Sequence, residues 1–416
     1  MVLYMRRFFS VFAVLLMFSV AGFAQPGAQD SLRLSYWVQG TVFGGDTYKG
    51  VESALVSIPD GTVATVTNSD GRFVIKSPKP FNKIRISHLG YETEVREVSH
   101  GESVKVKLKP LSFTLEGAKI ISGDPEGLVR AAIERIAGNY GREASLLECF
   151  YRETVRKRTR YIYISEAVSR IYKTGYDRGV ERDRCALEKS RVLISPRASD
   201  TLSVKVQGGP AQAAQLDVVK NWQMLFDNEE MKLYTFEMGV PTYIAGRLQF
   251  VINFRPTFLL EDRALYYGTL YIDQELLYFT RIEMSMDMSD PALAARQMVV
   301  SKPATLRLTP KEMTIVVNYS ESDGVVRLSY FRSVFRFNCD WRKRLLATNY
   351  TAVNELVVTD LLSPADPIAR SEAFRTQDVL SDKAAEFLDP DFWKDYNIIE
   401  PSESLEHAVD RLRKGR

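Results

Sequence analysis

The sequence predicts a mainly β protein with a few helices, in which a small N-terminal β-sandwich precedes a larger α+β domain built on an antiparallel sheet. Two observations predict this fold class. Short apolar strands separated by turn residues fill residues 31–112, and many short strands of this kind are typical of a sandwich. From Tyr234 onward, apolar and polar residues alternate over long runs, which indicates strands with one buried face.

The first 24 residues have the pattern of a secretory signal peptide. Arg6 and Arg7 precede an apolar run over 8–20, and Gly22 and Ala24 occupy the −3 and −1 positions of a cleavage site after Ala24. The run is shorter than the roughly 20 apolar residues that a spanning helix needs. We therefore expect cleavage near Ala24 and a mature chain that is periplasmic or associated with the outer membrane. An uncleaved N-terminal anchor is the alternative.

Charge and cysteine content narrow the function classes. The 55 Lys and Arg residues nearly balance the 52 Asp and Glu residues and are interspersed with them, which argues against a nucleic-acid partner. The densest basic cluster, at 156–160, is interpreted as a solvated turn or strand end. Cys149, Cys185 and Cys339 are too few for a disulfide framework. We expect them to be buried, although the sequence leaves one pairing open.

A turn motif marks the N-terminal region. Asp70 is expected to accept hydrogen bonds within its own turn, Gly71 to adopt a positive φ, and Phe73 to anchor the turn to the core. Strands are expected at 38–42, 54–58, 63–67, 73–75, 84–88, 91–98 and 104–108.

The same residues carry a family resemblance. The turn Thr67-Asn68-Ser69-Asp70-Gly71-Arg72-Phe73 and the later strand end Ser87-His88-Leu89-Gly90-Tyr91-Glu92 resemble two motifs of carboxypeptidase regulatory-like domains, which have a transthyretin-like β-sandwich. Asp70, Gly71, Phe73, Gly90 and Tyr91 are the structural positions of these motifs. The resemblance implies an accessory docking module over 31–112 that is not itself a catalyst.

A linker is expected at 113–127 and the larger domain at 128–380. Asp124 and Pro125 supply an N-cap and a first-turn proline for a helix that ends near 138–141, and helical spacing predicts a second helix over 211–227. Asp273 to Glu275 form a predicted hairpin turn, and a second hairpin turn is predicted over 320–324. Strands are expected at 150–155, 161–172, 192–195, 202–206, 248–254, 278–286, 313–319, 325–337 and 345–358.

Residues 381–416 are expected to form a tail that docks back on the sheet. Phe392, Trp393 and Tyr396 supply the apolar contacts, and Ser402 caps a final helix. That helix is too short to be stable without such support.

The larger sheet carries a second resemblance. The run Tyr267-Gly268-Thr269-Leu270-Tyr271-Ile272-Asp273, followed by Phe279-Thr280-Arg281, is similar to periplasmic lipoprotein-carrier half-barrels. This implies a curved antiparallel sheet wrapped around a helix. A second sandwich and a transmembrane barrel are the alternatives.

Motifs for catalysis are missing from the sequence. His88, His100 and His407 are far apart and lack zinc-peptidase spacing. No nucleophile elbow or phosphate-binding loop occurs. Paired carboxylates are harder to exclude, and the candidates are Glu261 with Asp262, Asp273 with Glu275, and Asp389 with Asp391. We name no catalytic, cofactor-binding or metal-binding residue and no ligand-binding residue.

These observations favour an exported cell-envelope binding or scaffold protein without catalytic activity or cofactor. The sandwich would serve as a docking module, and the larger sheet would bind an apolar or polymeric ligand or an envelope partner. The expected partner is an envelope protein, a glycan or a lipid, at the periphery of the outer membrane or in the periplasm. The alternatives are a glycan-directed hydrolase with a carboxylate pair and a short relative of outer-membrane receptors.

Overall fold

The computed structural model describes residues 36–59, 62–111, 123–197, 200, 208–298, 306–341, 347–383, 385–386 and 392–414. The predicted signal peptide, most of the predicted linker, the strand expected at 202–206 and the acids Asp389 and Asp391 lie outside these residues.

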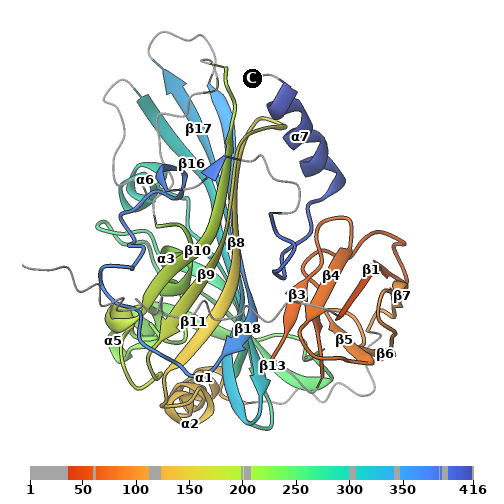
Figure 1. The fold of residues 1–416 in the computed structure, drawn as a ribbon. Helices are drawn as coiled ribbons and strands as arrows, with labels where there is room; N and C mark the ends of the chain where they lie inside the picture. The colour runs from red at the N-terminus through yellow and green to blue at the C-terminus, as the bar shows by residue number, and fades with distance from the viewer. Residues whose placement is uncertain are drawn as a thin grey trace, which may run out of the picture. The chain divides into compact units, whose positions relative to one another are not determined.

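The N-terminal region is a sandwich of two small sheets (Figure 1). One sheet has the order β4-β1-β7, with β7 parallel to β1, and the other has the order β3-β2-β5-β6. Alternate residues such as Val38, Phe73, Ile75 and Ile84 point between the sheets and form a buried core, as period-two patterns require. The strands are β1 (Tyr36–Gly44), β2 (Leu55–Ser57), β3 (Ala64–Val66), β4 (Arg72–Ser77), β5 (Lys83–Ser87), β6 (Glu94–Glu97) and β7 (Ser103–Leu108).

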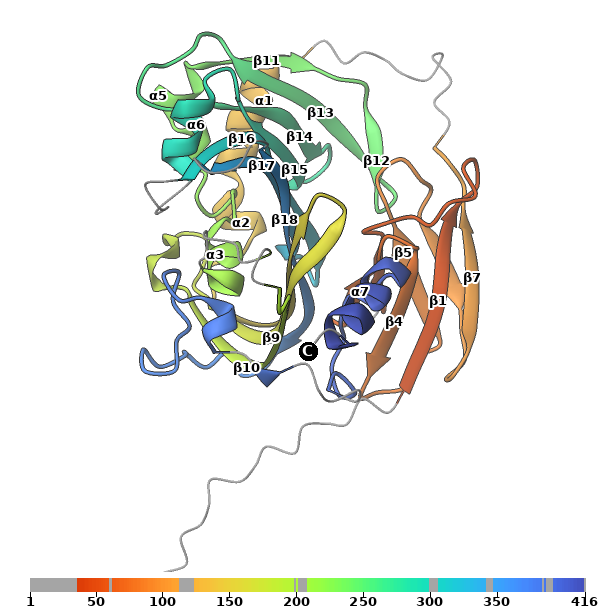
Figure 2. The same cartoon turned by 90° about the horizontal axis from the view of Figure 1, so that it is seen from above.

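The larger region is built on one curved sheet that joins twelve described strands (Figure 2). Its order is β11-β13-β14-β15-β16-β17-β18-β8-β9-β10-β19, with β12 paired to β13. All of these pairs are antiparallel except β10 with β19. The predicted mainly β fold class is confirmed. The strands are β8 (Ser145–Lys157), β9 (Arg160–Lys173), β10 (Arg184–Ile194), β11 (Tyr234–Met238), β12 (Thr242–Ile244), β13 (Arg247–Pro256), β14 (Tyr266–Asp273), β15 (Phe279–Met286), β16 (Leu306–Ser322), β17 (Val325–Trp341), β18 (Thr348–Leu362) and β19 (Ala385–Glu386).

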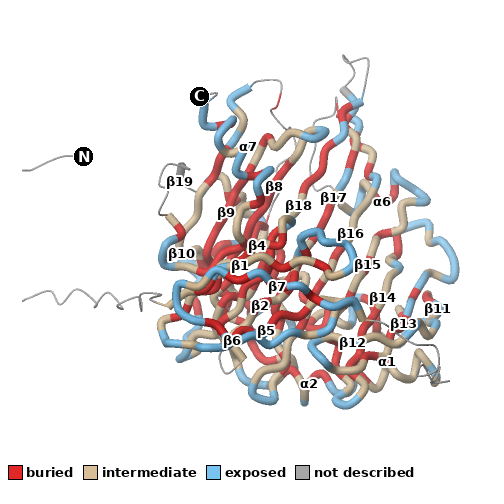
Figure 3. The backbone as a smooth tube through the Cα atoms, turned by 90° about the vertical axis from the view of Figure 1, so that its right-hand side faces the viewer, coloured by how far each residue is buried: buried red, intermediate tan, exposed pale blue. Residues whose placement is uncertain are grey.

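Short helices cover the concave face of this sheet (Figure 2). Val129, Ala213 and Phe226 from these helices, and Val219 from the turn between α3 and α4, pack against strand residues such as Ile252 and form one extended core. In this core β8 and β9 are buried over most of their length (Figure 3). The concave face is therefore filled by the chain's own side chains over this region. These helices are α1 (Pro125–Glu134), α2 (Ile136–Asn139), α3 (Gly209–Gln215), α4 (Gln223–Phe226), α5 (Asn228–Met231) and α6 (Pro291–Met298), and the 3₁₀ helices are η1 (Val180–Arg182) and η3 (Leu380–Asp382). The last helix, α7 (Glu403–Lys414), lies on the other side of the sheet and packs against Ile164 and Leu193 (Figure 2).

The single helix predicted over 211–227 is wrong, because the chain leaves the α-helical conformation after Gln215 and resumes it at Gln223. Asp217 is turned inward at the break. Its carboxylate accepts hydrogen bonds from the hydroxyls of Tyr176, at 2.7 Å, and Tyr319, at 2.8 Å. Aspartate competes with the helical backbone for hydrogen bonds, and here these buried partners fix it outside a helix.

The basic cluster and the cysteines occupy structural positions. Arg158 lies in the tight β8–β9 hairpin turn with φ of 57°, which agrees with the interpretation of the 156–160 cluster. Cys149, Cys185 and Cys339 are all free and buried. The open disulfide pairing is therefore not present in this structure.

The turn motif of the sandwich differs from expectation in one detail. Asn68, rather than Asp70, caps the turn, because its Oδ1 accepts from the backbone amides of Asp70 and Arg72, each at 2.9 Å. Asp70 Oδ2 instead accepts from the amide of Glu403, at 2.7 Å, at the start of α7. Gly71 has φ of +77°, and Phe73 is buried in the sandwich core. The Asp70 side chain is therefore available to a distant part of the chain.

We predict that Gly71→Ala destabilises the protein more than Gly90→Ala does. Both glycines have a positive φ, which costs an alanine about 1–2 kcal/mol. A Cβ on Gly71 would lie 2.1 Å from the Val42 carbonyl oxygen, whereas a Cβ on Gly90 meets nothing within 4 Å. Crowding adds about 1–3 kcal/mol at Gly71. Urea unfolding of the two variants measures the difference, and equal losses would contradict the prediction.

Candidate functional site

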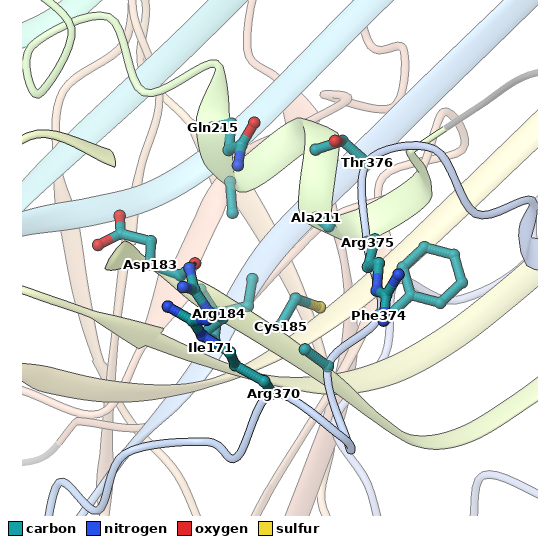
Figure 4. Close-up of a pocket in the computed structure, with 12 residues that line it drawn as sticks. Ile171, Asp183, Arg184, Cys185, Ala211, Gln215, Arg370, Phe374, Arg375 and Thr376 are labelled. Carbon is teal, nitrogen blue, oxygen red and sulfur yellow. Dashed lines mark hydrogen bonds between the residues drawn. The ribbon is translucent and has the colours of Figure 1, made fainter. Parts of the chain in front are cut away.

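A cavity of about 270 Å³ lies where β10 begins, beside α3 and the segment 370–376 (Figure 4). Its floor is apolar and includes Ile171 and Cys185 from β9 and β10, Ala211 from α3, and Phe374. Phe374 is held in place because its backbone amide donates to the Cys185 carbonyl at 2.7 Å. A strand pair, a helix and a loop therefore position this cavity.

Three arginines line the cavity: Arg184, Arg370 and Arg375. Arg184 Nη1 donates to the carbonyls of Glu181, at 2.6 Å, and Asp183, at 2.8 Å, which fixes its guanidinium close to its own backbone. Arg370 and Arg375 are exposed. Within the part of the chain that the structure describes, neither guanidinium forms a hydrogen bond or an ion pair. The lining therefore carries three positive charges, and of the three guanidinium groups only that of Arg184 forms hydrogen bonds within the described residues.

Asp183 is the single acid among the described lining residues, and it belongs to a buried ion network. Its carboxylate lies 2.6 Å from Lys220 Nζ and 3.3 Å from Lys173 Nζ, and Lys173 Nζ lies 3.0 Å from Asp217. Two lysines and two aspartates balance in charge, and all four side chains are almost completely buried. The negative charge of Asp183 is therefore neutralised by Lys173 and Lys220, neither of which lines the cavity.

The pKa directions of Asp217 and Lys173 agree with this pairing, whereas burial and the neighbouring Lys173 lower the pKa of Lys220. Burial alone would raise the pKa of Asp217, but Lys173 and the two tyrosine hydroxyls lower it overall. Burial would lower the pKa of Lys173, but Asp217 and Asp183 raise it. Both groups therefore stay charged in the folded protein. Removing one member would leave an uncompensated buried charge, so the network serves the fold.

A separate buried acid, Glu153, lies on the same face of β8 as Tyr151. Its carboxylate accepts from the Tyr151 hydroxyl at 2.9 Å and from the Tyr163 hydroxyl of β9. Burial raises the pKa of Glu153 to about 7, against the opposing effect of these two hydrogen bonds. Glu153 is thus a buried, titratable group with tyrosine neighbours and no second acid among its hydrogen-bond partners.

Among the predicted carboxylate pairs in the described residues, Asp273 and Glu275 both approach Arg247, which lies 2.6 Å from Asp273 and 3.6 Å from Glu275. Asp273 accepts two hydrogen bonds from Arg247, at 2.6 and 2.9 Å, and also caps its own hairpin turn. Glu275 is exposed in that turn, and Glu261 and Asp262 are exposed in the β13–β14 loop. None of these four lines the arginine-bearing cavity.

The three histidines also remain apart. His88 is in the sandwich, where burial and the nearby Arg281 lower its pKa. His100 Nδ1 accepts from the Trp37 amide at 3.2 Å, and His407 is exposed on α7. A search of the described residues finds no group of three or more His, Cys, Asp or Glu side chains that could hold a metal ion. Among the described helices, none combines the length and apolar character needed to cross a membrane.

Sequence reasoning missed the arginine-lined cavity. Arg184 is separated from Arg370 and Arg375 by almost half of the chain, and no local motif joins them. The pairing of Phe374 with Cys185 brings the two segments together, and nothing in the sequence pattern signals that contact.

Residues 38–118 match the family model for the CarboxypepD_reg-like domain, which confirms the first resemblance. Among curated proteins, none matches the chain. Solved structures of lipoprotein-sorting and LolA type are among the matches, as the second resemblance predicted.

Three of these structures illustrate the likeness. A domain named as an outer membrane lipoprotein-sorting protein, from Vibrio parahaemolyticus, has 13% identity, covers 60% of this chain and 96% of its own, and has a TM-score of 0.25. The MucA/MucB complex of Pseudomonas aeruginosa has 16% identity, 59% and 100% coverage, and a TM-score of 0.19. A LolA superfamily protein from Nitrosomonas europaea has 11% identity, 58% and 96% coverage, and a TM-score of 0.18. At such low TM-scores and identities, the likeness supports no inference about function.

We predict that Glu153→Gln reduces the pH dependence of folding stability. Because the folded pKa of about 7 lies above the ordinary glutamate value of 4.5, the folded state holds a proton that the unfolded state releases. This contribution is fully present below about pH 4.5 and is lost as the pH rises through 7, by on the order of 3 kcal/mol. Denaturant titrations at pH 5 and pH 8 measure it.

The matched control is Glu94→Gln, at an exposed position of β6, which should leave the pH dependence as in the wild type. Identical pH dependence in the wild type and Glu153→Gln would contradict the prediction.

Proposed function

We propose that this chain is an exported cell-envelope binding protein without catalytic activity, and that its larger domain receives the anionic group of a ligand in the arginine-lined cavity. One observation carries the proposal. Arg370 and Arg375 line the cavity, and neither guanidinium forms an ion pair among the described residues, whereas the lining acid, Asp183, is neutralised by Lys173 and Lys220. The acid near Arg375 is Asp378, whose pKa is lowered by Lys383 and also by Arg375.

The chemistry of the cavity favours a phosphate or carboxylate group. Guanidinium groups bind both in a bidentate manner, and such charge-assisted hydrogen bonds are stronger than neutral ones. The apolar floor of Ile171, Ala211 and Phe374 would accept a short apolar portion next to the anionic group. At about 270 Å³, the cavity fits a head group and not a long chain. Lipid head groups and envelope peptides both offer this chemistry.

The filled concave face argues against a carrier that holds a long apolar ligand under the curved sheet, which is one of the ligand types that the sequence left open. Phe226 of α4 and Val219 of the turn before it already occupy that face, so the part of the face that they cover is closed to a long apolar ligand. Among the described residues the hydrolase alternative has no supporting observation either, because Asp273 is hydrogen-bonded to Arg247.

The sandwich is proposed to act as a docking module of fixed orientation. Thr62 donates to Asp360 of β18, Ser53 and Tyr330 hydroxyls lie 3.0 Å apart, and Arg332 lies 3.4 Å from Glu52. These contacts support a sandwich that is carried rigidly on the convex face. Export is inferred from the N-terminal signal pattern alone.

We predict that hexyl phosphate binds the purified protein more tightly than hexyl β-glucoside, which has the same tail and no charge. Arg370→Ala and Arg375→Ala should each weaken hexyl phosphate binding about tenfold or more, since hydrogen bonds to charged groups contribute about 1.5–3 kcal/mol. Added salt should weaken it further. Isothermal titration calorimetry measures all three effects, and hexanoate distinguishes carboxylate from phosphate preference.

The control variant is Arg96→Ala, an exposed arginine of β6 in the sandwich, which should bind hexyl phosphate like the wild type. The proposal fails if the glucoside binds equally well, or if both cavity variants retain full affinity while remaining folded.

A further inference from the structure

The segment from Phe392 to Glu403, here called the tail segment, lies between the sandwich and the convex face of the larger sheet. Figures 1 and 2 show the chain leading into α7 between β4 of the sandwich and β8 and β9. Trp393, Ile398 and Ile399 are buried there against Phe150 and Val168 of the sheet. We call the space between the sandwich and the convex face of the sheet, which the tail segment fills, the interdomain groove.

The groove holds the tail segment mainly by its backbone carbonyls. Lys76 Nζ donates to the carbonyls of Trp393 and Lys394, each at 3.1 Å, and of Tyr396, at 2.9 Å. Thr65 Oγ1 donates to the Ile398 carbonyl at 3.0 Å. Residues 392–396 form a turn, in which the Tyr396 amide donates to the Trp393 carbonyl at 3.1 Å. Lys76 therefore binds the carbonyls of this turn, and Thr65 binds the chain that follows it.

Further donors continue the pattern toward α7. Arg152 Nη2, from the sheet, donates to the Ile399 carbonyl at 2.7 Å. The Pro401 carbonyl accepts from Asn68 Nδ2, at 3.0 Å, and from Arg72 Nη2, at 2.7 Å. Asn68 and Arg72 belong to the turn motif of the sandwich, so that motif binds peptide carbonyls in addition to shaping its own turn.

Two side chains of the tail segment provide selectivity. The Trp393 ring packs edge-on against Phe150, at 5.6 Å between centroids, and its indole nitrogen donates to Glu166 at 3.0 Å. Asn397 bonds the backbone of Lys76 in both directions, accepting from its amide at 2.7 Å and donating to its carbonyl at 2.8 Å. An aromatic residue followed four positions later by asparagine therefore fits the groove.

We propose that the interdomain groove is a receptor for peptides that adopt a turn, occupied in this chain by its own tail segment. The partner it fits is a peptide segment of another protein with an aromatic residue, a turn that places an asparagine four residues later, and apolar residues with accessible backbone carbonyls after it. Such a segment binds by displacing the tail segment, so the tail segment acts as a built-in competitor. The inference is independent of the arginine-lined cavity.

The test uses the full chain with a weakened tail segment. A fluorescein-labelled peptide with the sequence of residues 392–403 is titrated against the wild type and against Trp393→Ala, with fluorescence anisotropy as the readout. The variant is expected to bind the peptide at least tenfold more tightly than the wild type, because its own segment has lost the aromatic anchor. Asn397→Ala should act in the same direction and serves as the second variant if Trp393→Ala does not fold.

Two controls separate groove binding from general loosening. His407→Ala alters an exposed residue of α7 and should leave the groove closed to the peptide. Adding Lys76→Met or Thr65→Val to Trp393→Ala removes carbonyl donors and should reduce peptide affinity again. The proposal is overturned if the folded Trp393→Ala or Asn397→Ala protein does not bind the peptide, or if Lys76→Met leaves that binding unchanged.

Discussion

The arrangement of the two domains depends on the buried Glu166 carboxylate. It lies 2.6 Å from Arg152 and 2.7 Å from Arg191, and it accepts from the Trp393 indole. Burial would raise the pKa of Glu166, but Arg152, Arg191 and Trp393 lower it overall, so it stays ionised. Breaking such a buried pair typically costs about 3–5 kcal/mol. Arg152 also binds the tail segment, which in turn binds the sandwich, so one ion cluster connects all three parts.

Much of the fold was predictable because it follows from local pattern. Alternation in β15 and β17 and the turn residues of the sandwich predicted strands where strands occur, and the aromatic residues near Trp393 predicted a docking tail. The predictions that were wrong depended on contacts between residues far apart in the sequence. Asp217 breaks the predicted helix because Tyr319, far along the chain, fixes its carboxylate. Asp70 turns away from its own turn because α7 presents the amide of Glu403.

The candidate site was harder to predict for the same reason. Its arginines have no shared motif, and a charged residue at a loop is normally solvated. Only the contact between Phe374 and Cys185 makes Arg184, Arg370 and Arg375 neighbours. The predicted acids that lie within the described residues, by contrast, are in or next to turns, and Asp273 shows how such an acid can be held in the structure by one arginine.

The cavity and the groove lie on opposite faces of the same strands, which raises the question of coupling. Ile171 and Cys185 belong to the core under the helices, whereas Val168 and its neighbour Glu166 face the tail segment. Coupling between two sites needs an element with two arrangements that both ligands bias. β9 is paired along its length with β8 and β10, which opposes any shift of register, since a slip would turn every side chain to the other face.

The chain itself offers a second route between the sites, because the cavity wall at 370–376 precedes the tail segment. That route is interrupted by anchors. Phe374 and Leu380 are both buried in the core of the larger domain, so displacing the tail segment would have to break these contacts before it moved Arg370 or Arg375. Occupation of the cavity and exchange in the groove should therefore be separable properties of one rigid sheet, each with its own residues and its own partner.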